Sequence, residues 1–171
     1  MSVYRGMAFL VWAAVSASVV PEAPVETLTG KRLELSRDVA SGPAVLIIGF
    51  TKTSRAQTSE WSRRLQPEIS KTSAVQVYEV AVIADVPRLM RGFVIGQIRG
   101  SVPKAIHSHF LLVKEQADVW RRLAGPGDED AAYLVLLSRG EVVWRGTGKL
   151  TEVGYQSLIQ ALKALPQDSA P

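Results

Sequence analysis

One turn of the chain contains the residues best suited to nucleophilic chemistry. It reads Phe50-Thr51-Lys52-Thr53-Ser54-Arg55-Ala56-Gln57-Thr58 and joins an apolar segment to an amphipathic one. A serine hydroxyl becomes a nucleophile only beside a base, and neither of the two histidines lies near Ser54 in the sequence. We therefore interpret Ser54 as a helix cap, with its hydroxyl near the free backbone N–H groups at the helix start.

The two histidines, His107 and His109, form a second candidate site. On a strand, their alternate spacing would place both imidazoles on one side, as a weak metal site requires. No acidic or sulfur ligand lies close by in the sequence, whereas a usable site needs three or four ligands. We predict no metal and no cofactor, and interpret this segment as the solvated start of a strand.

Composition excludes several functions. The chain has 171 residues, of which 47% are hydrophobic, and no cysteine. The length fits one globular domain. The lack of cysteine excludes disulfides, thiolate metal sites, dithiol redox chemistry and cysteine nucleophiles. The formal charge of +4 comes from cations scattered among acids, so we predict no nucleic-acid partner.

One apolar segment is bordered by four cations, which are our candidates for contact with a partner: Arg88, Arg91, Arg99 and Lys104. A basic amphipathic helix lies on an anionic membrane surface or binds an acidic partner. The sequence favours a simpler alternative, a helix packed on the sheet, with Asp85 as its cap and Arg88 and Arg91 in water. Its apolar positions would then face the core: Leu89, Met90, Phe93 and Val94.

Apolar runs elsewhere predict one α/β domain. Ala44 to Phe50 is a continuous apolar run of strand length, and we expect it to lie centrally in the sheet, covered on both faces. Glu26 to Ser36 reads as a hairpin turning at Gly30. Ser138-Arg139-Gly140 separates the two strands of a second hairpin. Further strands are predicted at Val75 to Ile83, Phe110 to Val113, Ala132 to Leu137 and Glu141 to Arg145.

Helices are predicted between these strands. Trp61, Leu65 and Ile69 recur at four-residue spacing after the turn, and Pro67 should bend this helix or end it early. A short helix is expected around Asp118 to Leu123. The final helix, Glu152 to Leu165, should place these residues on one side: Val153, Leu158, Ile159 and Leu162.

The first twenty residues have the order of a secretory signal peptide. Arg5 precedes an apolar run from Met7 to about Val20, and small residues and two prolines follow. This order is typical of a signal peptide, although an uncleaved anchor fits as well. We predict a signal peptide or N-terminal anchor at 1–20, one domain at 25–165 and a disordered tail at 166–171. The protein would be exported, to the periplasm or another extracytoplasmic space, and could stay attached to the membrane through this segment.

The predicted element order resembles the thioredoxin-like fold, a central mixed sheet flanked by helices with a closing β-hairpin and a C-terminal helix. It is similar to the branch shared by periplasmic thioredoxin-like proteins and peroxiredoxins. Aligned on the peroxiredoxin F-T-x-x-C motif, Thr51 is the family threonine and Ser54 takes the cysteine position. Aligned on the thioredoxin dithiol, Arg55 and Thr58 replace the two cysteines. Where thioredoxins have a cis-proline, this chain has Ala131-Ala132.

A more specific resemblance runs from about Arg88 to Gly148. It includes R-x-x-R-G, I-R-G-S-V-P, D-A-A-Y-L-V-L-L and G-x-V-x-W-R-G-x-G. These segments look like mitochondrial ATP synthase assembly factors of thioredoxin-like fold, whose family role is to assist a membrane subunit of the Fo sector.

These resemblances imply a redox-inactive binding, chaperone or assembly protein that assists a membrane complex, with ATP synthase as the specific candidate. Its partner would be a polypeptide or membrane protein, contacted through the turn and the Ala131-Ala132 strand start. The alternative is a thiol-independent enzyme or an antioxidant-type protein of peroxiredoxin-like fold. An enzyme would need a base within about 3 Å of the Ser54 hydroxyl.

Overall fold

The structure, a computed structural model, describes residues 18–69 and 74–166. The predicted leader and tail therefore lie largely outside the described residues. No helix in the described ranges is long and apolar enough to cross a membrane. Eight strands form one mixed sheet in the order β1-β8-β7-β4-β5-β6-β2-β3.

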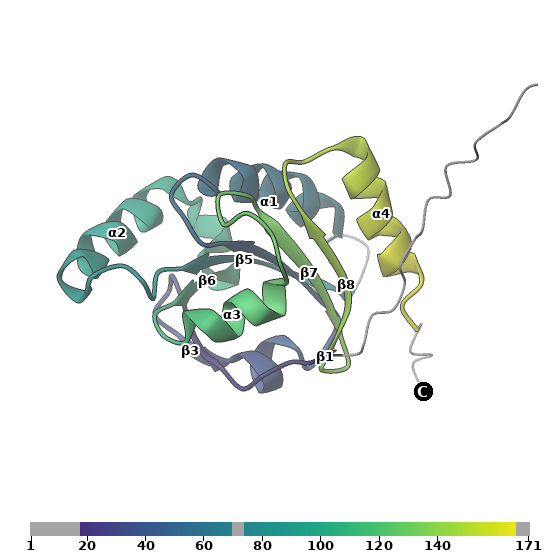
Figure 1. The fold of residues 1–171 in the computed structure, drawn as a ribbon, viewed down its shortest axis with the longest axis horizontal. Coiled ribbons are helices and arrows are strands. Elements are labelled where there is room, and N and C mark those ends of the chain that lie inside the picture. Colours follow the sequence, from purple (N-terminus) through teal and green to yellow (C-terminus); the bar gives the residue numbers. More distant parts are fainter. Residues whose placement is uncertain (1–17, 70–73, 167–171) are drawn as a thin grey trace, which may run out of the picture.

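The elements follow one another along the chain as Figure 1 shows: β1(Ser18–Val19), β2(Pro24–Thr27), β3(Arg32–Glu34), the π-helix η1(Leu35–Val39), β4(Ala44–Gly49), α1(Arg55–Ile69), β5(Gln76–Val82), α2(Arg88–Ser101), the 3-10 helix η2(Lys104–His109), β6(Phe110–Val113), α3(Ala117–Ala124), β7(Tyr133–Ser138), β8(Glu141–Thr147) and α4(Glu152–Lys163).

Strand β4 lies at the centre of the sheet, as its apolar run predicts. It pairs in parallel with β5 and antiparallel with β7. Five of its six residues are fully buried, from Ala44 to Ile48. A strand covered on both faces has no polar side to expose, so β4 reads as an uninterrupted hydrophobic segment.

Two helical layers cover the sheet (Figure 1). On one face, Val45 and Ile47 pack with residues of α1 and α4, including Leu65 and Leu158. On the other face, Leu46 and Ile48 belong to a cluster with η1 and α3. The side chains of β4 alternate between these layers because successive strand residues point to opposite faces.

The predicted hairpins are confirmed, and a helix follows the turn after β4 as predicted. Gly30 turns the first hairpin at φ +89°, and Arg139 and Gly140 turn the second with φ values of +52° and +77°. Helix α1 contains Pro67 and is described as far as Ile69.

The prediction for the packing of α2 is wrong. Leu89, Met90 and Phe93 are exposed, and Ile98 is the residue of this helix that is buried. The helix does have an apolar stripe at Leu89, Met90 and Phe93, but this stripe faces away from the core. The stripe that meets the sheet is centred on Ile98, and Val94 is half-buried beside it.

The prediction of the polar groups around α2 also needs correction. Pro87 precedes the helix and no side chain caps it, while Asp85 pairs with Arg121 instead. Arg91 is half-buried, not outside, and donates hydrogen bonds to the carbonyls of Val86 and Ala84, at 2.9 and 2.7 Å. Arg91 lies seven residues before Ile98, two helical turns away on the same side, and so faces the protein.

Two smaller expectations fail. Val153, expected on the buried side of the final helix, is 82% exposed. The buried residues of α4 are Tyr155 and Leu158. His107 and His109 lie in the 3-10 helix η2, so they do not alternate along a strand.

Candidate functional site

The turn between β4 and α1 is closed by its own hydrogen bonds. The Ser54 hydroxyl donates to the Thr51 carbonyl at 2.9 Å and accepts from the Thr51 N–H at 3.4 Å. The Thr51 hydroxyl oxygen in turn accepts from the Ser54 N–H at 3.2 Å. Ser54 is fully buried and directly precedes Arg55, the first residue of α1. The predicted cap is not formed, because its hydroxyl bonds within the turn and not to the first N–H groups of the helix.

The geometry of an activated nucleophile is not present at Ser54. The hydrogen-bond partners of the Ser54 hydroxyl in the described residues are main-chain groups of Thr51, and a main-chain amide is no general base. His107 and His109 make their hydrogen bonds elsewhere, with the Val102 carbonyl and with side chains of Ser108 and Gln76.

The start of β7 is bonded to this turn and to α1. Thr51 donates its hydroxyl to Asp130 Oδ1 at 2.7 Å. The Ala132 N–H donates to the side-chain oxygen of Gln57 at 3.1 Å, and the Ala132 carbonyl accepts from the Gly148 N–H at 2.8 Å. The peptide bonds of the described residues are all trans. The backbone groups of Ala132 are therefore engaged by the chain itself.

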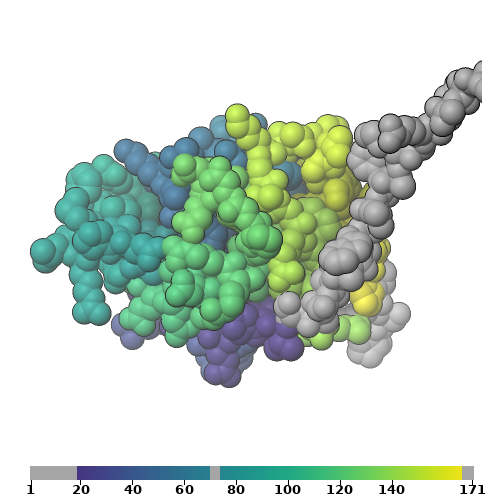
Figure 2. Space-filling model, in the orientation of Figure 1, coloured from purple at the N-terminus to yellow at the C-terminus, as the bar shows by residue number. Residues whose placement is uncertain are grey.

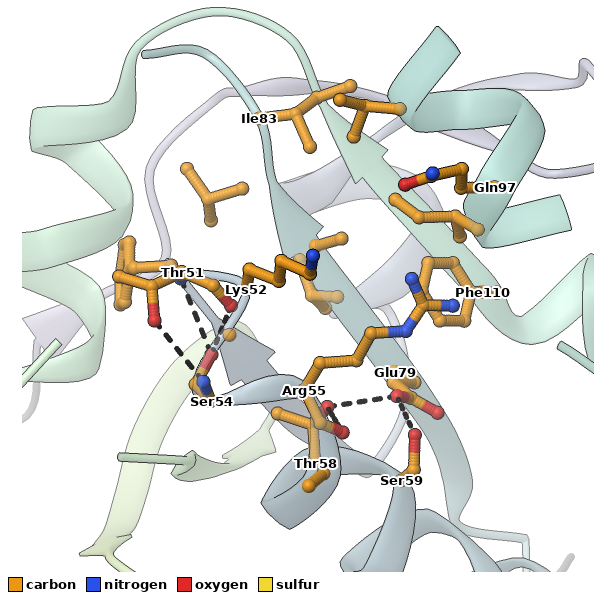
Figure 3. A pocket seen from close by; sticks show the side chains of 18 of the residues that line it. Thr51, Lys52, Ser54, Arg55, Thr58, Ser59, Glu79, Ile83, Gln97 and Phe110 are labelled. Atoms are coloured by element: carbon orange, nitrogen blue, oxygen red, sulfur yellow. Dashed lines mark hydrogen bonds between the residues drawn. The ribbon is translucent and has the colours of Figure 1, made fainter. Parts of the chain in front are cut away.

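A cavity of about 530 Å³ opens on the other side of the turn, between α1, β5 and α2 (Figure 3). Four residues that the sequence singled out line it: Thr51, Ser54, Arg55 and Thr58. Its remaining walls are mainly apolar and include Val82, Ile83, Val94, Ile98 and Phe110. Ala131 and Ala132 do not line this cavity, although Thr51 and Gln57 hydrogen-bond the turn and α1 to the start of β7.

A buried carboxylate forms part of the cavity wall. Glu79 of β5 is 4% exposed and accepts a hydrogen bond from the Thr58 hydroxyl at 3.0 Å and one from Ser59 at 3.4 Å. Burial raises the pKa of Glu79, and these hydroxyls and the nearby Arg55 oppose the rise. Desolvation dominates because the strand offers the carboxylate no ion-pair partner at contact distance in the described residues.

Two cations lie beside the cavity. Figure 3 shows Arg55 reaching from α1 across toward Phe110 and Gln97, with Lys52 above it. Arg55 also donates a hydrogen bond to Ser101 at the end of α2. The cavity thus combines apolar walls, hydroxyls, one buried acid and two cations, a composition suited to holding an apolar group that carries an anionic or hydrogen-bonding end.

A second, smaller hollow of about 420 Å³ is lined by Phe50 and Tyr133 together with residues of α3 and of the loop that follows it. Its main polar residue is Arg121, which pairs with Glu129 at 2.5 Å, with Asp118 at 3.1 Å and with Asp85. The hydrogen bonds that Arg121 donates to these carboxylates, the one to Glu129 first, raise the pKa of Arg121. Arg121 already has its partners within the chain, so we assign this hollow a structural role.

The other predicted cations do not line the cavity. Arg88, Arg99 and Lys104 are exposed, and none forms a salt bridge with a described residue. No group of three or more His, Asp or Glu side chains in the described ranges is arranged to hold a metal ion.

Two residues of the site escaped the sequence analysis. Glu79 is a single acid inside the apolar segment VQVYEVAVI, and a buried strand that interrupts its apolar run with a carboxylate is the signal that could have identified it. Gln57 gave no such signal, because its bond to Ala132 joins residues 75 apart in the chain.

The G-x-V-x-W-R-G-x-G segment has a structural explanation. A Cβ at Gly146 would lie 2.5 Å from the Trp144 ring, and Gly148 adopts a φ of +109°. The Gly148 carbonyl accepts the Trp61 indole N–H at 3.0 Å. The glycines therefore let β8 pass beneath a tryptophan and turn toward α4.

The overall structure is similar to several solved proteins at low sequence identity. The exposed lipoprotein thioredoxin of Streptococcus pneumoniae matches with a TM-score of 0.59 and 14% identity, over 85% of this chain and 100% of that one. A thiol:disulfide interchange protein assigned as DsbE, from Chlorobium tepidum, matches with a TM-score of 0.60 and 19% identity, over 86% and 95%.

BsSco, a member of the Sco family of cytochrome c oxidase assembly proteins, matches with a TM-score of 0.57 and 11% identity, over 87% of this chain and 94% of its own. No protein-family model and no curated protein matches the sequence. At these identities the likeness shows the fold alone.

Proposed function

We propose that this chain, which has a thioredoxin-like fold and no cysteine, is a non-catalytic binding protein that assists the assembly of a membrane complex. The thiol chemistry typical of the fold needs cysteine, so redox catalysis by thiols is excluded. What supports a binding role is the apolar cavity beside the turn, with Arg55, Lys52 and Glu79 around it.

A polypeptide segment is the ligand class that fits this cavity. Its volume of about 530 Å³ has room for one or two apolar side chains, and pockets of this kind bind through apolar walls with a few polar groups fixing orientation. An acidic or carbonyl group on the same segment would meet Arg55 and Lys52. The closed hydrogen bonding at Ala132 directs the segment to the cavity and away from the start of β7.

The assembly role is supported by resemblance. The R-x-x-R-G and G-x-V-x-W-R-G-x-G segments look like those of ATP synthase assembly factors, which makes a membrane subunit of that complex our specific candidate partner. BsSco belongs to a family of cytochrome c oxidase assembly proteins, so assembly is compatible with the fold. Export, to the periplasm or a similar space, is part of the proposal and is in keeping with the exposed lipoprotein among the similar structures.

Filling the cavity tests the binding role. Ala81 lines the cavity, and Ala81→Phe should occupy part of it; Val153→Phe on exposed α4 adds the same ring elsewhere. A photo-crosslinker placed at Gln97 should capture a membrane polypeptide in the unfilled protein and in the Val153→Phe variant. Capture should fall at least several-fold in Ala81→Phe. Equal capture in both variants, with both folded by circular dichroism, would exclude the cavity as the binding site.

A further inference from the structure

Helix α2 is held to the domain along one side, where Arg91, Val94 and Ile98 face the protein. Ile98 and the following Val102 pack in a cluster with Leu28, Ile83 and Phe110. The opposite side of the first half of α2 is exposed, and the helix forms a lobe at one end of the molecule (Figure 2).

The outer face of α2 is an apolar ridge, which we define as Leu89, Met90 and Phe93. These side chains are 98%, 51% and 62% exposed. Leu89 and Phe93 are four residues apart and therefore neighbours on one helix face. Soluble domains expose single apolar residues routinely, but three large ones together on a protruding helix indicate a contact surface.

Cations and no acids accompany this ridge. Residues 87–113 contain no Asp or Glu. Arg88 and Arg99 are eleven residues apart, close to three full turns, so their side chains leave the helix in nearly the same direction, on the side of the ridge nearest Leu89. Lys104 follows the helix, and all three cations are exposed without a salt bridge to a described residue. The nearest acid before the helix, Asp85, is paired with Arg121.

We propose that α2 docks on an anionic membrane surface, with Leu89, Met90 and Phe93 entering the interfacial region and Arg88, Arg99 and Lys104 contacting lipid phosphates. This arrangement is typical of an amphipathic helix lying in the plane of a membrane. Each cation near an anionic surface strengthens binding about fivefold.

A lipid surface fits the ridge better than an acidic protein does. The three side chains stand on a convex lobe, whereas a stable protein interface buries about 800 Å² on each partner. Lipid headgroups adapt to such a small ridge, and a folded partner does not. The docked helix would bring the cavity, which α2 helps to line through Val94, Gln97 and Ile98, close to the membrane surface. The docking does not depend on the cavity being occupied.

The lack of cysteine allows a direct test on the full chain. Phe93→Cys and Val153→Cys each introduce a single thiol at an exposed apolar position, one on α2 and one on α4. Each thiol is labelled with a fluorophore sensitive to polarity. Vesicles of phosphatidylcholine with phosphatidylglycerol should shift the emission of the label at 93 to the blue and leave the label at 153 nearly unchanged. Both proteins carry the same N-terminal segment, so the difference reports α2.

Charge variants complete the test. Arg88→Gln with Arg99→Gln should weaken the response at 93 about twenty-fivefold, whereas Lys149→Gln with Lys163→Gln, which removes the same net charge from exposed sites elsewhere, should leave it unchanged. The vesicles contain no polypeptide, so this response does not depend on whether the cavity binds one. Three outcomes would overturn it: no shift at 93, equal shifts at 93 and 153, or a shift produced by polyglutamate but not by vesicles.

Discussion

Helices α1 and α2 lie over the same face of the sheet but are attached to it in opposite ways. Helix α1 buries five residues along its whole length, including Trp61, Leu65 and Ile69. Helix α2, almost as long, buries Ile98 alone. Both helices have an apolar stripe, but only α1 packs its large apolar side chains into the core. An amphipathic pattern therefore does not by itself show that a helix stabilises the fold.

The largest expected effect tests this difference with one substitution at two places. Leu65→Ala removes a fully buried side chain from α1 and should lower the free energy of unfolding by about 2–5 kcal/mol. Leu89→Ala on α2 should change it by less than about 0.5 kcal/mol. Urea denaturation of both variants measures the two changes in the free energy of unfolding. A loss above 2 kcal/mol for Leu89→Ala would mean that the ridge packs against the protein.

Glycines supply a second matched pair. A Cβ at Gly49 would lie 2.8 Å from Ser54 Oγ and 3.1 Å from Thr58 Cγ2, whereas one at Gly96 meets nothing within 4 Å. Gly49→Ala should destabilise the fold by about 1–3 kcal/mol through overpacking. Gly96→Ala should stabilise it by about 0.5–1 kcal/mol through higher helix propensity. In thermal unfolding, the midpoint temperature should fall for Gly49→Ala and rise for Gly96→Ala. A change in the same direction for both variants would contradict the prediction.

A third test concerns the closed start of β7. Gln57→Ala removes the acceptor of the Ala132 N–H and should cost about 1 kcal/mol, because a partly buried donor loses its partner. Amide hydrogen exchange at Ala132 should accelerate. Exchange in the middle of β4 should change only as much as the lower free energy of unfolding of the whole domain requires. Unchanged protection at Ala132 would show that Gln57 is not its partner in solution.

The smallest effect at any one pH is expected for Glu79→Gln, which keeps the size of the side chain and an acceptor for Thr58. Burial raises the pKa of Glu79 above its ordinary value of 4.5. At pH values between the ordinary and the raised pKa, Glu79 is protonated in the folded protein and ionised in the unfolded chain. The folded protein then binds more protons, so the free energy of unfolding falls as the pH rises. Glu79→Gln cannot ionise, so its free energy of unfolding lacks this dependence on pH. Its stability relative to the parent should therefore grow from about pH 4 toward neutrality, as denaturation at several pH values would show; a constant difference contradicts a raised pKa.

The sequence predicted the sheet better than the site. Apolar runs such as Ala44 to Phe50 have one stable environment, the interior of a sheet, and so identify their strands and the central position of β4. The turn residues Gly30 and Gly140 marked the hairpins because their positive φ values favour glycine.

The packing of α2 and the second half of the site could not be predicted in the same way. Helical periodicity shows that Leu89 and Phe93 share a face, but it contains no information about what covers that face. The cavity depends on how far α2 stands from β5, and the Gln57 bond depends on two segments 75 residues apart. Both are properties of the folded chain and leave no local pattern.

The bond between Gln57 and Ala132 gives the start of β7 a built-in competitor. Where a bound peptide would need the Ala132 N–H, the protein already presents its own amide oxygen at 3.1 Å. A tethered group of this kind acts at an effective concentration of millimolar order or higher, so any free peptide must exceed that before it occupies the same N–H. Weak and accidental ligands are thereby kept off this edge, and only a segment that gains additional contacts elsewhere on the surface could displace the glutamine.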